Sequence, residues 1–423
     1  MTYSSTAAGS GLRLAPFRGL RYVPGRVGSL AAVTSPPYDV VVRPDGRRHL
    51  ETADPHNVVR LILPDAATAD ARNRKAARTL AAWLDEGVLA ADPHPAVYVY
   101  EQRDGDHLQR GVIGALRLSG PEQGAVLPHE DVMPGPVADR AALMTATRAN
   151  LEPLLLVYRD GDATARVVER TAAGARPLLA TTTEDGVRHR LWALTDPGDL
   201  AAIDADLATR QALIADGHHR WATYRRLQAE HRPGGPWDYG LVLLVDSARY
   251  PLRVRAIHRV LPGLPVGAAL EAAGGAFRVR ALGASLDTAL AALAEAAADG
   301  NAFVLAGDGY HLLDRPAPDR IASAVRADRP PAWRHLDATV LHHLLLDEVW
   351  QVPDAPEHIR YIHDTGAAVE LAERLGGSAV LMHPVDERVV LELARDGVMM
   401  PRKSTSFGPK PASGLVMRGL DLG

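Results

Sequence analysis

The sequence predicts a mixed α and β protein with more than one lobe. Its 423 residues exceed the roughly 150 residues of a typical domain, so two to three domains are expected. Hydrophobic residues make up 47% of the chain and charged residues 23%, as in folded globular proteins. Short β-type runs alternate with segments of helical periodicity, which is typical of mixed folds.

The expected strands are mostly four to eight residues long and lie between turn-forming residues. They cover residues 96–101, 111–118, 154–158, 191–194, 241–245, 256–261, 302–305 and 379–382. Apolar residues recur at helical spacing in 70–87 and in the alanine-rich segment 286–297, so we expect amphipathic helices there. Helices are also expected from Asp139 towards Asn150 and over 338–346.

Clusters of proline and glycine mark the expected lobe boundaries. They lie at residues 233–236, 262–265 and 330–331. We therefore expect a first domain over residues 1–265, with a large insertion around 66–200, and a C-terminal α/β lobe over 266–423 that carries a cationic loop at 400–411.

Composition excludes several classes of site and partner. The chain has no cysteine, which excludes disulfides, thiolate metal sites and thiol catalysis. A formal charge of -4 gives no general basic field, so a nucleic-acid partner is not expected. No apolar run approaches the ~20 residues that span a bilayer, and the N-terminus lacks a basic start followed by an apolar run. A cytoplasmic protein without membrane contact is expected.

The densest polar cluster is Ile214-Ala215-Asp216-Gly217-His218-His219-Arg220, which has the pattern of strand, tight turn and helix. Asp216 is expected to be the N-cap, and Gly217 permits the turn. Free amides, the helix dipole and the cations of the first helical turn all favour phosphate. Asp216 could instead hold a divalent cation that bridges phosphates. The alternative is a capped surface helix whose first turn is basic.

A second cluster is Thr34-Ser35-Pro36-Pro37-Tyr38-Asp39-Val40-Val41. The two prolines stiffen the loop and hold Tyr38 and Asp39 in place. Asp39 is a candidate base or metal ligand. The alternative is a rigid turn in which Tyr38 packs and Asp39 caps.

Two further groups contain histidine. His129 and Glu130 form a pair that can relay protons but is also common at solvated helix starts. His342 and His343 lie in an expected helix, where adjacent residues point about 100° apart and cannot both face one metal.

The C-terminal loop 400–411 is rich in proline and strongly cationic. It contains Lys403 and Lys410, and the only other lysine is Lys75. Such a loop can clamp anionic ligands. The lysine ammonium is a compact charge, whereas the arginine guanidinium is a planar fork, so lysine suits a site that needs a compact cation against phosphate or carboxylate. Chance and solvent exposure are the alternative. The loop does not have the Walker spacing.

In these motifs the sequence resembles the bacterial domain-of-unknown-function family 1015 (DUF1015). The resemblance is carried by the segments 35–41, 57–61, 215–220 and 400–405, and by His129-Glu130, Asp139-Arg140 and Ala149-Asn150 in the same order. The Asp-Gly-His-His-Arg segment also resembles the phosphate-binding signature of the ParB and sulfiredoxin-like superfamily, which includes nucleotide-dependent kinases of free L-serine. Where the family often has Tyr after this arginine, the chain has Trp221. Its larger ring could alter the nucleotide or acceptor pocket, so the identity of the substrate stays open.

The resemblance implies a ParB/sulfiredoxin-like nucleotide-binding core and a kinase that uses ATP and Mg2+. Its small-molecule substrate would be L-serine or a related hydroxy amino acid, giving O-phospho-L-serine. Gly217, His218, His219 and Arg220 would hold the nucleotide, and Asp216 would lie close to the magnesium ion and the transferred group, with His218 beside it.

Three further assignments complete this hypothesis. Asp39 is the best candidate for the base. Lys403 and Lys410 would stabilise phosphate or carboxylate charge. Two alternatives stay open: a ParB-like nucleotide-dependent switch, and a metallohydrolase that uses His218 or His219 with a carboxylate. The choice among ATP, ADP and CTP and the oligomeric state stay open too.

Overall fold

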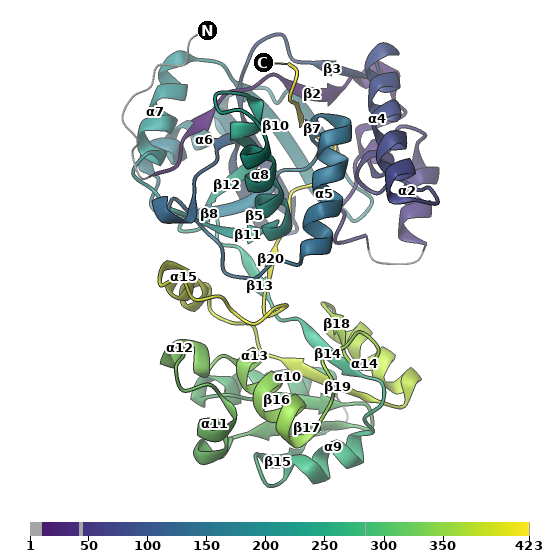
Figure 1. The fold of residues 1–423 in the computed structure, drawn as a ribbon, viewed down its shortest axis with the longest axis vertical. Helices are drawn as coiled ribbons and strands as arrows, with labels where there is room; N and C mark the ends of the chain where they lie inside the picture. The colour runs from purple at the N-terminus through teal and green to yellow at the C-terminus, as the bar shows by residue number, and fades with distance from the viewer. Residues whose placement is uncertain (1–10, 42–44, 284, 423) are drawn as a thin grey trace. The chain divides into compact units, whose positions relative to one another are not determined.

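The computed structural model describes residues 11–41, 45–283 and 285–422. The N-terminal residues in which no basic start and apolar run were found lie outside the described ranges. The chain forms two compact units (Figure 1). The first comprises Met1–Pro128, Val132–Leu252 and Pro409–Gly423, and the second comprises His129–Asp131 and Arg253–Gly408.

A mixed sheet of nine strands forms the centre of the first unit. The strands are β1 (Leu14–Ala15), β4 (Val97–Asp104), β5 (His107–Arg117), β6 (Val126–Leu127), β8 (Leu154–Tyr158), β9 (Leu179–Thr182), β10 (Arg188–Leu194), β11 (Ala212–Asp216) and β12 (Tyr239–Asp246). Their order is β6–β11–β8–β12–β5–β4–β10–β9, and β1 pairs with β5 outside that path. The pairs β11–β6 and β12–β8 are parallel, and the other pairs are antiparallel.

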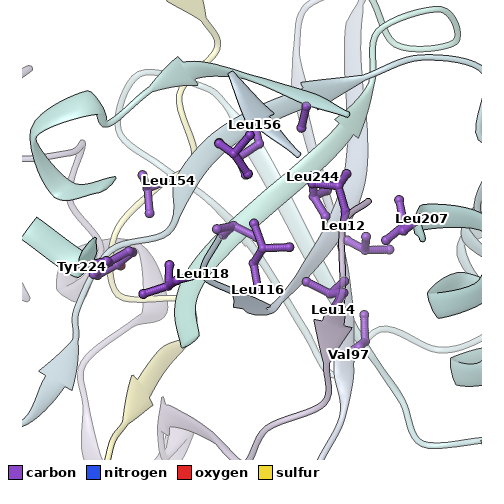
Figure 2. Packing of buried hydrophobic residues seen from close by; sticks show 14 of the residues in the cluster. Leu12, Leu14, Val97, Leu116, Leu118, Leu154, Leu156, Leu207, Tyr224 and Leu244 are labelled. Carbon is purple, nitrogen blue, oxygen red and sulfur yellow. The ribbon is translucent and has the colours of Figure 1, made fainter. Parts of the chain in front are cut away.

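One buried hydrophobic core of the first unit lies on this sheet. Every residue of β8 is buried, as is β12 after its first residue, because a near-continuous apolar run suits a strand covered on both faces. Leu116, Leu154, Leu156 and Leu244 belong to one buried cluster with Tyr224 (Figure 2). This packing fixes the ends of the strands from which the candidate site is built.

Helices and a smaller sheet complete the first unit. The helices are α1 (Leu30–Val33), α2 (Gly46–Ala53), α3 (Val59–Ile62), α4 (Ala69–Asp85), α5 (Pro134–Thr147), α6 (Asp162–Gly174), α7 (Pro197–Leu207) and α8 (His218–Glu230), with short 3-10 turns at Pro24–Arg26, Pro121–Gln123 and Pro236–Asp238. The smaller sheet is antiparallel, in the order β3 (Leu89–Ala91), β2 (Gly19–Tyr22), β21 (Met417–Gly419), β7 (Ala149–Asn150). Helices α5 and α8 pack against each other.

The second unit is a six-stranded antiparallel sheet with helices. The sheet order is β15 (Arg278–Ala281), β17 (Tyr310–Asp314), β16 (Phe303–Ala306), β19 (Ser378–Met382), β14 (His258–Leu261), β18 (Arg360–Ile362), and β13 (Arg253–Arg255) pairs separately with β20 (Ser406–Gly408). The helices are α9 (Val266–Ala273), α10 (Leu286–Asp299), α11 (Pro318–Ala324), α12 (Pro331–Arg334), α13 (Asp337–Val340), a π-helix (Leu341–Val349), α14 (Thr365–Leu375) and α15 (Glu387–Arg395). Its core joins α10 and α14 to the sheet.

The predicted mixed α and β class is confirmed. All eight expected strands overlap observed ones, and the predicted strand 154–158 coincides with β8. The helix expected to run towards Asn150 ends at Thr147, because Arg148 takes a left-handed conformation (φ 47°) and Ala149–Asn150 form β7. The expected domain boundary at residue 265 stays a prediction. The boundary between the two compact units in this part of the chain lies between Leu252 and Arg253.

Across the described ranges, no helix combines the length and the apolar character that crossing a membrane requires.

Candidate active site

The candidate site begins where β11 passes into α8. Strand β11 ends at Asp216, Gly217 forms the turn with φ 99°, and α8 begins at His218. This left-handed conformation favours glycine, and a Cβ atom on Gly217 would lie 3.1 Å from the Leu154 side chain. The predicted strand, turn and helix are therefore present.

The predicted N-cap was wrong. Gly217 occupies the N-cap position of α8, without a side-chain cap, because Asp216 is still part of the strand. The Asp216 carboxylate instead forms two ion pairs: Oδ2 lies 2.6 Å from Arg220 Nη2, and Oδ1 lies 2.6 Å from Lys410 Nζ.

Lys410 joins two segments that the sequence singled out separately. Its Nζ donates to Asp216 and also to Asp39. Burial alone would lower the pKa of Lys410, but the charges of Asp216 and Asp39 outweigh burial and raise the pKa above its usual value. A cation that stays charged is thus held between two carboxylates.

Arg220 lies beneath the turn in the protein interior. It is 2% exposed, and its Nη1 donates to the Pro153 carbonyl oxygen at 2.9 Å. Burial would lower the pKa of Arg220, but Glu152 and Asp216 outweigh burial and raise it. The expectation of direct phosphate contact does not fit this placement, because the guanidinium faces buried protein groups.

Glu152 is a buried carboxylate that sequence reasoning missed. Its Oε1 accepts from the Tyr38 amide at 3.0 Å and from Ser413 Oγ at 3.1 Å. Burial raises the pKa of Glu152, and the charges of Arg220 and Arg140 oppose that rise. An acidic residue just before the fully apolar run 154–158 was the signal that could have found it.

The loop that carries Asp39 is held from both sides. The Tyr38 amide bonds to Glu152, and the Arg140 guanidinium lies 4.5 Å from the centre of the Tyr38 ring. Tyr38 is therefore packed, as the alternative interpretation of this loop expected. Asp39 itself is exposed and pairs with Lys410.

The two histidines of the motif lie in the first turn of α8 and are half-buried. His219 Nε2 accepts a hydrogen bond from the Met133 amide at 3.1 Å.

Other candidate residues belong to the second unit. Lys403 donates its amide to Glu130 Oε1 at 3.3 Å, and His129 Nε2 lies 3.1 Å from Thr405 Oγ1. The cationic loop 400–411 is therefore divided between the two units, because Lys403 belongs to the second unit and Lys410 to the first.

His342 and His343 have different neighbours, as expected for adjacent helical residues. His342 Nε2 lies 3.2 Å from Arg259 Nη2, and His343 Nδ1 lies 3.5 Å from Asp347. Burial, followed by the charge of Arg259, lowers the pKa of His342 to about 3.

A magnesium ion carried by a nucleotide would need one or two carboxylates. Asp216 can supply one carboxylate, and the Asp39 carboxylate lies close to it, because both contact the single nitrogen Lys410 Nζ. Within the described ranges, no three histidine, aspartate or glutamate side chains gather as a metal-binding group.

Comparison with known protein families identifies the family of this chain. The family model described as "Protein of unknown function (DUF1015)" matches residues 14–339. The chain belongs to the DUF1015 family. No curated protein matches it.

Solved structures give further similarities to this DUF1015 protein. A free serine kinase in complex with AMP is 15% identical, with 67% of this chain and 83% of that chain covered and a TM-score of 0.34. A conserved hypothetical protein from Pyrococcus furiosus is 16% identical, with 70% and 94% covered and a TM-score of 0.35. SbnI from Staphylococcus aureus is 10% identical, with 69% and 83% covered and a TM-score of 0.34.

Proposed function

We propose that this DUF1015 protein is an ATP-dependent kinase. It transfers the γ-phosphoryl group to the hydroxyl of a free small amino acid, L-serine first among them, giving O-phospho-L-serine. The observation that carries the proposal is Lys410 Nζ held between Asp39 and Asp216 beside the turn into α8. Phosphoryl transfer requires positioned groups and charge neutralisation, which this cluster can supply.

Nucleotide phosphates would bind at the N-terminal end of α8. The first-turn amides there have no partner within the helix, and the helix dipole favours negative charge. Gly217 brings the backbone close, because it has no Cβ atom and takes φ 99°. His218 and His219 line the same turn, whereas Arg220 supports it from below through Asp216.

Lys410 and Asp216 would handle the charge of the reacting phosphate. Lys410 stabilises charge on the transferred group, and Asp216 would hold a magnesium ion bound to the nucleotide. That ion supplies neutralisation of phosphate charge. The proposal leaves Lys403 outside this set, because Lys403 belongs to the second unit.

Asp39 is the proposed base. In the transfer, the serine O–H bond breaks and its proton moves to the Asp39 carboxylate, while the serine oxygen forms a bond to the γ-phosphorus. The bond from that phosphorus to the bridging oxygen breaks, and ADP leaves with the electron pair. Asp39 suits this role, because its side chain is 36% exposed and its loop is fixed through Tyr38 and Glu152.

The proposal is tested by following phosphorus directly. The purified protein is incubated with Mg2+, L-serine and ATP, ADP or CTP in turn, and 31P NMR is recorded against added O-phospho-L-serine. A phosphomonoester resonance that depends on both nucleotide and serine is expected. Nucleotide hydrolysis at the same rate with and without any hydroxy amino acid would instead favour the nucleotide-dependent switch, and no change in any nucleotide would overturn the proposal.

A further inference from the structure

The second unit contains a cavity that is separate from the residues discussed so far. Its volume is about 520 Å3, within the range of roughly 300–1,000 Å3 that small-molecule sites occupy. Side chains from β15, α10, α11 and α12, and the segment that follows β17, line it. Alanine, proline and isoleucine side chains of α10 and α11 supply apolar surface.

Two arginines of this cavity share one carboxylate. Arg278 Nε donates to Asp314 Oδ1 at 2.7 Å, and Arg280 Nη2 donates to Asp314 Oδ2 at 3.1 Å. The Asp314 side chain is only 5% exposed, so it is fixed in this double pairing. One positive charge at this wall is therefore uncompensated.

Two more arginines line the same cavity without an acidic partner. Within the described residues, neither Arg315 nor Arg334 forms an ion pair. The Nε atom of Arg334 is buried and has no hydrogen-bond partner. Arg315 and Arg334 are therefore two cationic side chains at the cavity whose charge no acidic group of the described residues pairs with.

Acidic side chains also line the cavity. Glu295 and Asp299 of α10 line the cavity, and with Asp314 they give three carboxylates against four guanidinium groups. The cavity thus has one net positive charge and contains both cationic and acidic side chains. A ligand that fits it carries an anionic group and also hydrogen-bond donors.

We propose that this cavity binds a small organic anion, whose carboxylate or phosphate group is held by Arg315 and Arg334. A guanidinium fork matches two oxygens of either group. Glu295 and Asp299 would accept hydrogen bonds from hydroxyl or amino groups elsewhere on the ligand. This proposal is independent of the kinase reaction, because every residue it uses belongs to the second unit.

The test uses the full chain with two probes, sodium phosphate and sodium acetate, at ionic strength held constant with sodium chloride. Hydrogen exchange followed by mass spectrometry localises any effect to the peptides that cover residues 312–336. We expect slower exchange there with phosphate, acetate or both. Phosphate alone would identify a phosphorylated ligand, and acetate alone would identify a carboxylate.

Three variants make the test specific. Arg334→Gln and Arg315→Gln are each expected to weaken the protection at least fivefold, measured as the anion concentration at half effect. Arg326→Gln is the matched control, because Arg326 is an exposed arginine of the same unit that pairs with Asp328 and does not line the cavity. Arg315 is also exposed, so its variant stays informative if Arg334→Gln does not fold. Protection by neither anion, or equal protection in Arg315→Gln and Arg326→Gln, would overturn the proposal.

Discussion

Lys410 Nζ lies 2.6 Å from Asp216 Oδ1, and the same nitrogen donates to Asp39. Asp39 and Lys410 are 371 residues apart in the chain, so the fold alone brings them together. Because the ammonium is largely buried, the two carboxylates determine its charge and its position. The predictions for the first unit depend on this contact.

Replacing Lys410 with methionine keeps most of the side-chain stem but removes the charge. Asp39 and Asp216 would then be left near each other without a cation. We expect turnover to fall by about 10²-fold or more. The free energy of unfolding is expected to fall by about 2–4 kcal/mol, because removing one partner leaves the buried carboxylates without their ion pair. Steady-state rates and urea denaturation measure the two effects.

Lys75→Met is the matched control, because Lys75 Nζ donates to the Asp65 carbonyl oxygen at the surface, away from the candidate site. Wild-type turnover in Lys410→Met would show that Lys410 has no role in the reaction.

Asp39→Asn keeps the shape of the side chain but cannot accept the serine proton. Turnover is expected to fall by roughly 10²- to 10⁴-fold, the range for general base catalysis, while ATP affinity changes little. The check is a rate at saturating substrates together with a calorimetric titration of ATP. A similar loss in Glu130→Gln with full activity in Asp39→Asn would move the base to Glu130.

Arg220→Gln should act mainly on stability. Removing this buried partner leaves Asp216 without one of its ion pairs and leaves Arg140 as the remaining cationic group that stabilises the Glu152 carboxylate. The free energy of unfolding is expected to fall by about 3–5 kcal/mol. Arg226→Gln on the same helix is the control, because Arg226 pairs with Glu230 at the surface and should cost about 1 kcal/mol or less. Equal losses in the two variants would contradict the buried role of Arg220.

Two buried histidines predict how stability depends on pH. Burial lowers the pKa of both His189 and His258 to about 4, against about 6.5 in an unfolded chain. Between pH 6.5 and 4 the unfolded chain binds more protons, so stability falls as the pH falls through this window. Each histidine contributes up to about 3 kcal/mol of this loss. Denaturation at several pH values should give a shallower slope in His189→Gln, and an unchanged slope would be inconsistent with the buried neutral histidine.

The local elements were predictable because their signals are local. The run 154–158 is continuously apolar, which suits a strand buried on both faces. Gly217 between a strand and a helix predicted the turn. The π-helix Leu341–Val349 was predicted only as an ordinary helix. Over two turns, the spacing of apolar side chains does not distinguish the hydrogen bonds of a π-helix from those of an α-helix.

The long-range part of the site could not be predicted. Nothing in the sequence around Lys410 indicates that it pairs with Asp39 and Asp216 rather than with solvent. The burial of Arg220 was missed for the same reason: a charged residue in a first helical turn is exposed by default, and only the fold supplies Asp216 and Glu152 as its partners.

The central claim is that the turn at Gly217 binds nucleotide phosphates, and calorimetry of ATP with magnesium tests it most directly. Gly217→Ala would place a Cβ atom 3.1 Å from Leu154 in a conformation with φ 99°. Gly87→Ala meets a similar backbone penalty at φ 69°, with no atom within 4 Å of the added Cβ. We predict that the wild type and Gly87→Ala bind ATP alike and that Gly217→Ala binds at least tenfold more weakly. Equal affinity in the two variants, or no binding by the wild type, would contradict the claim.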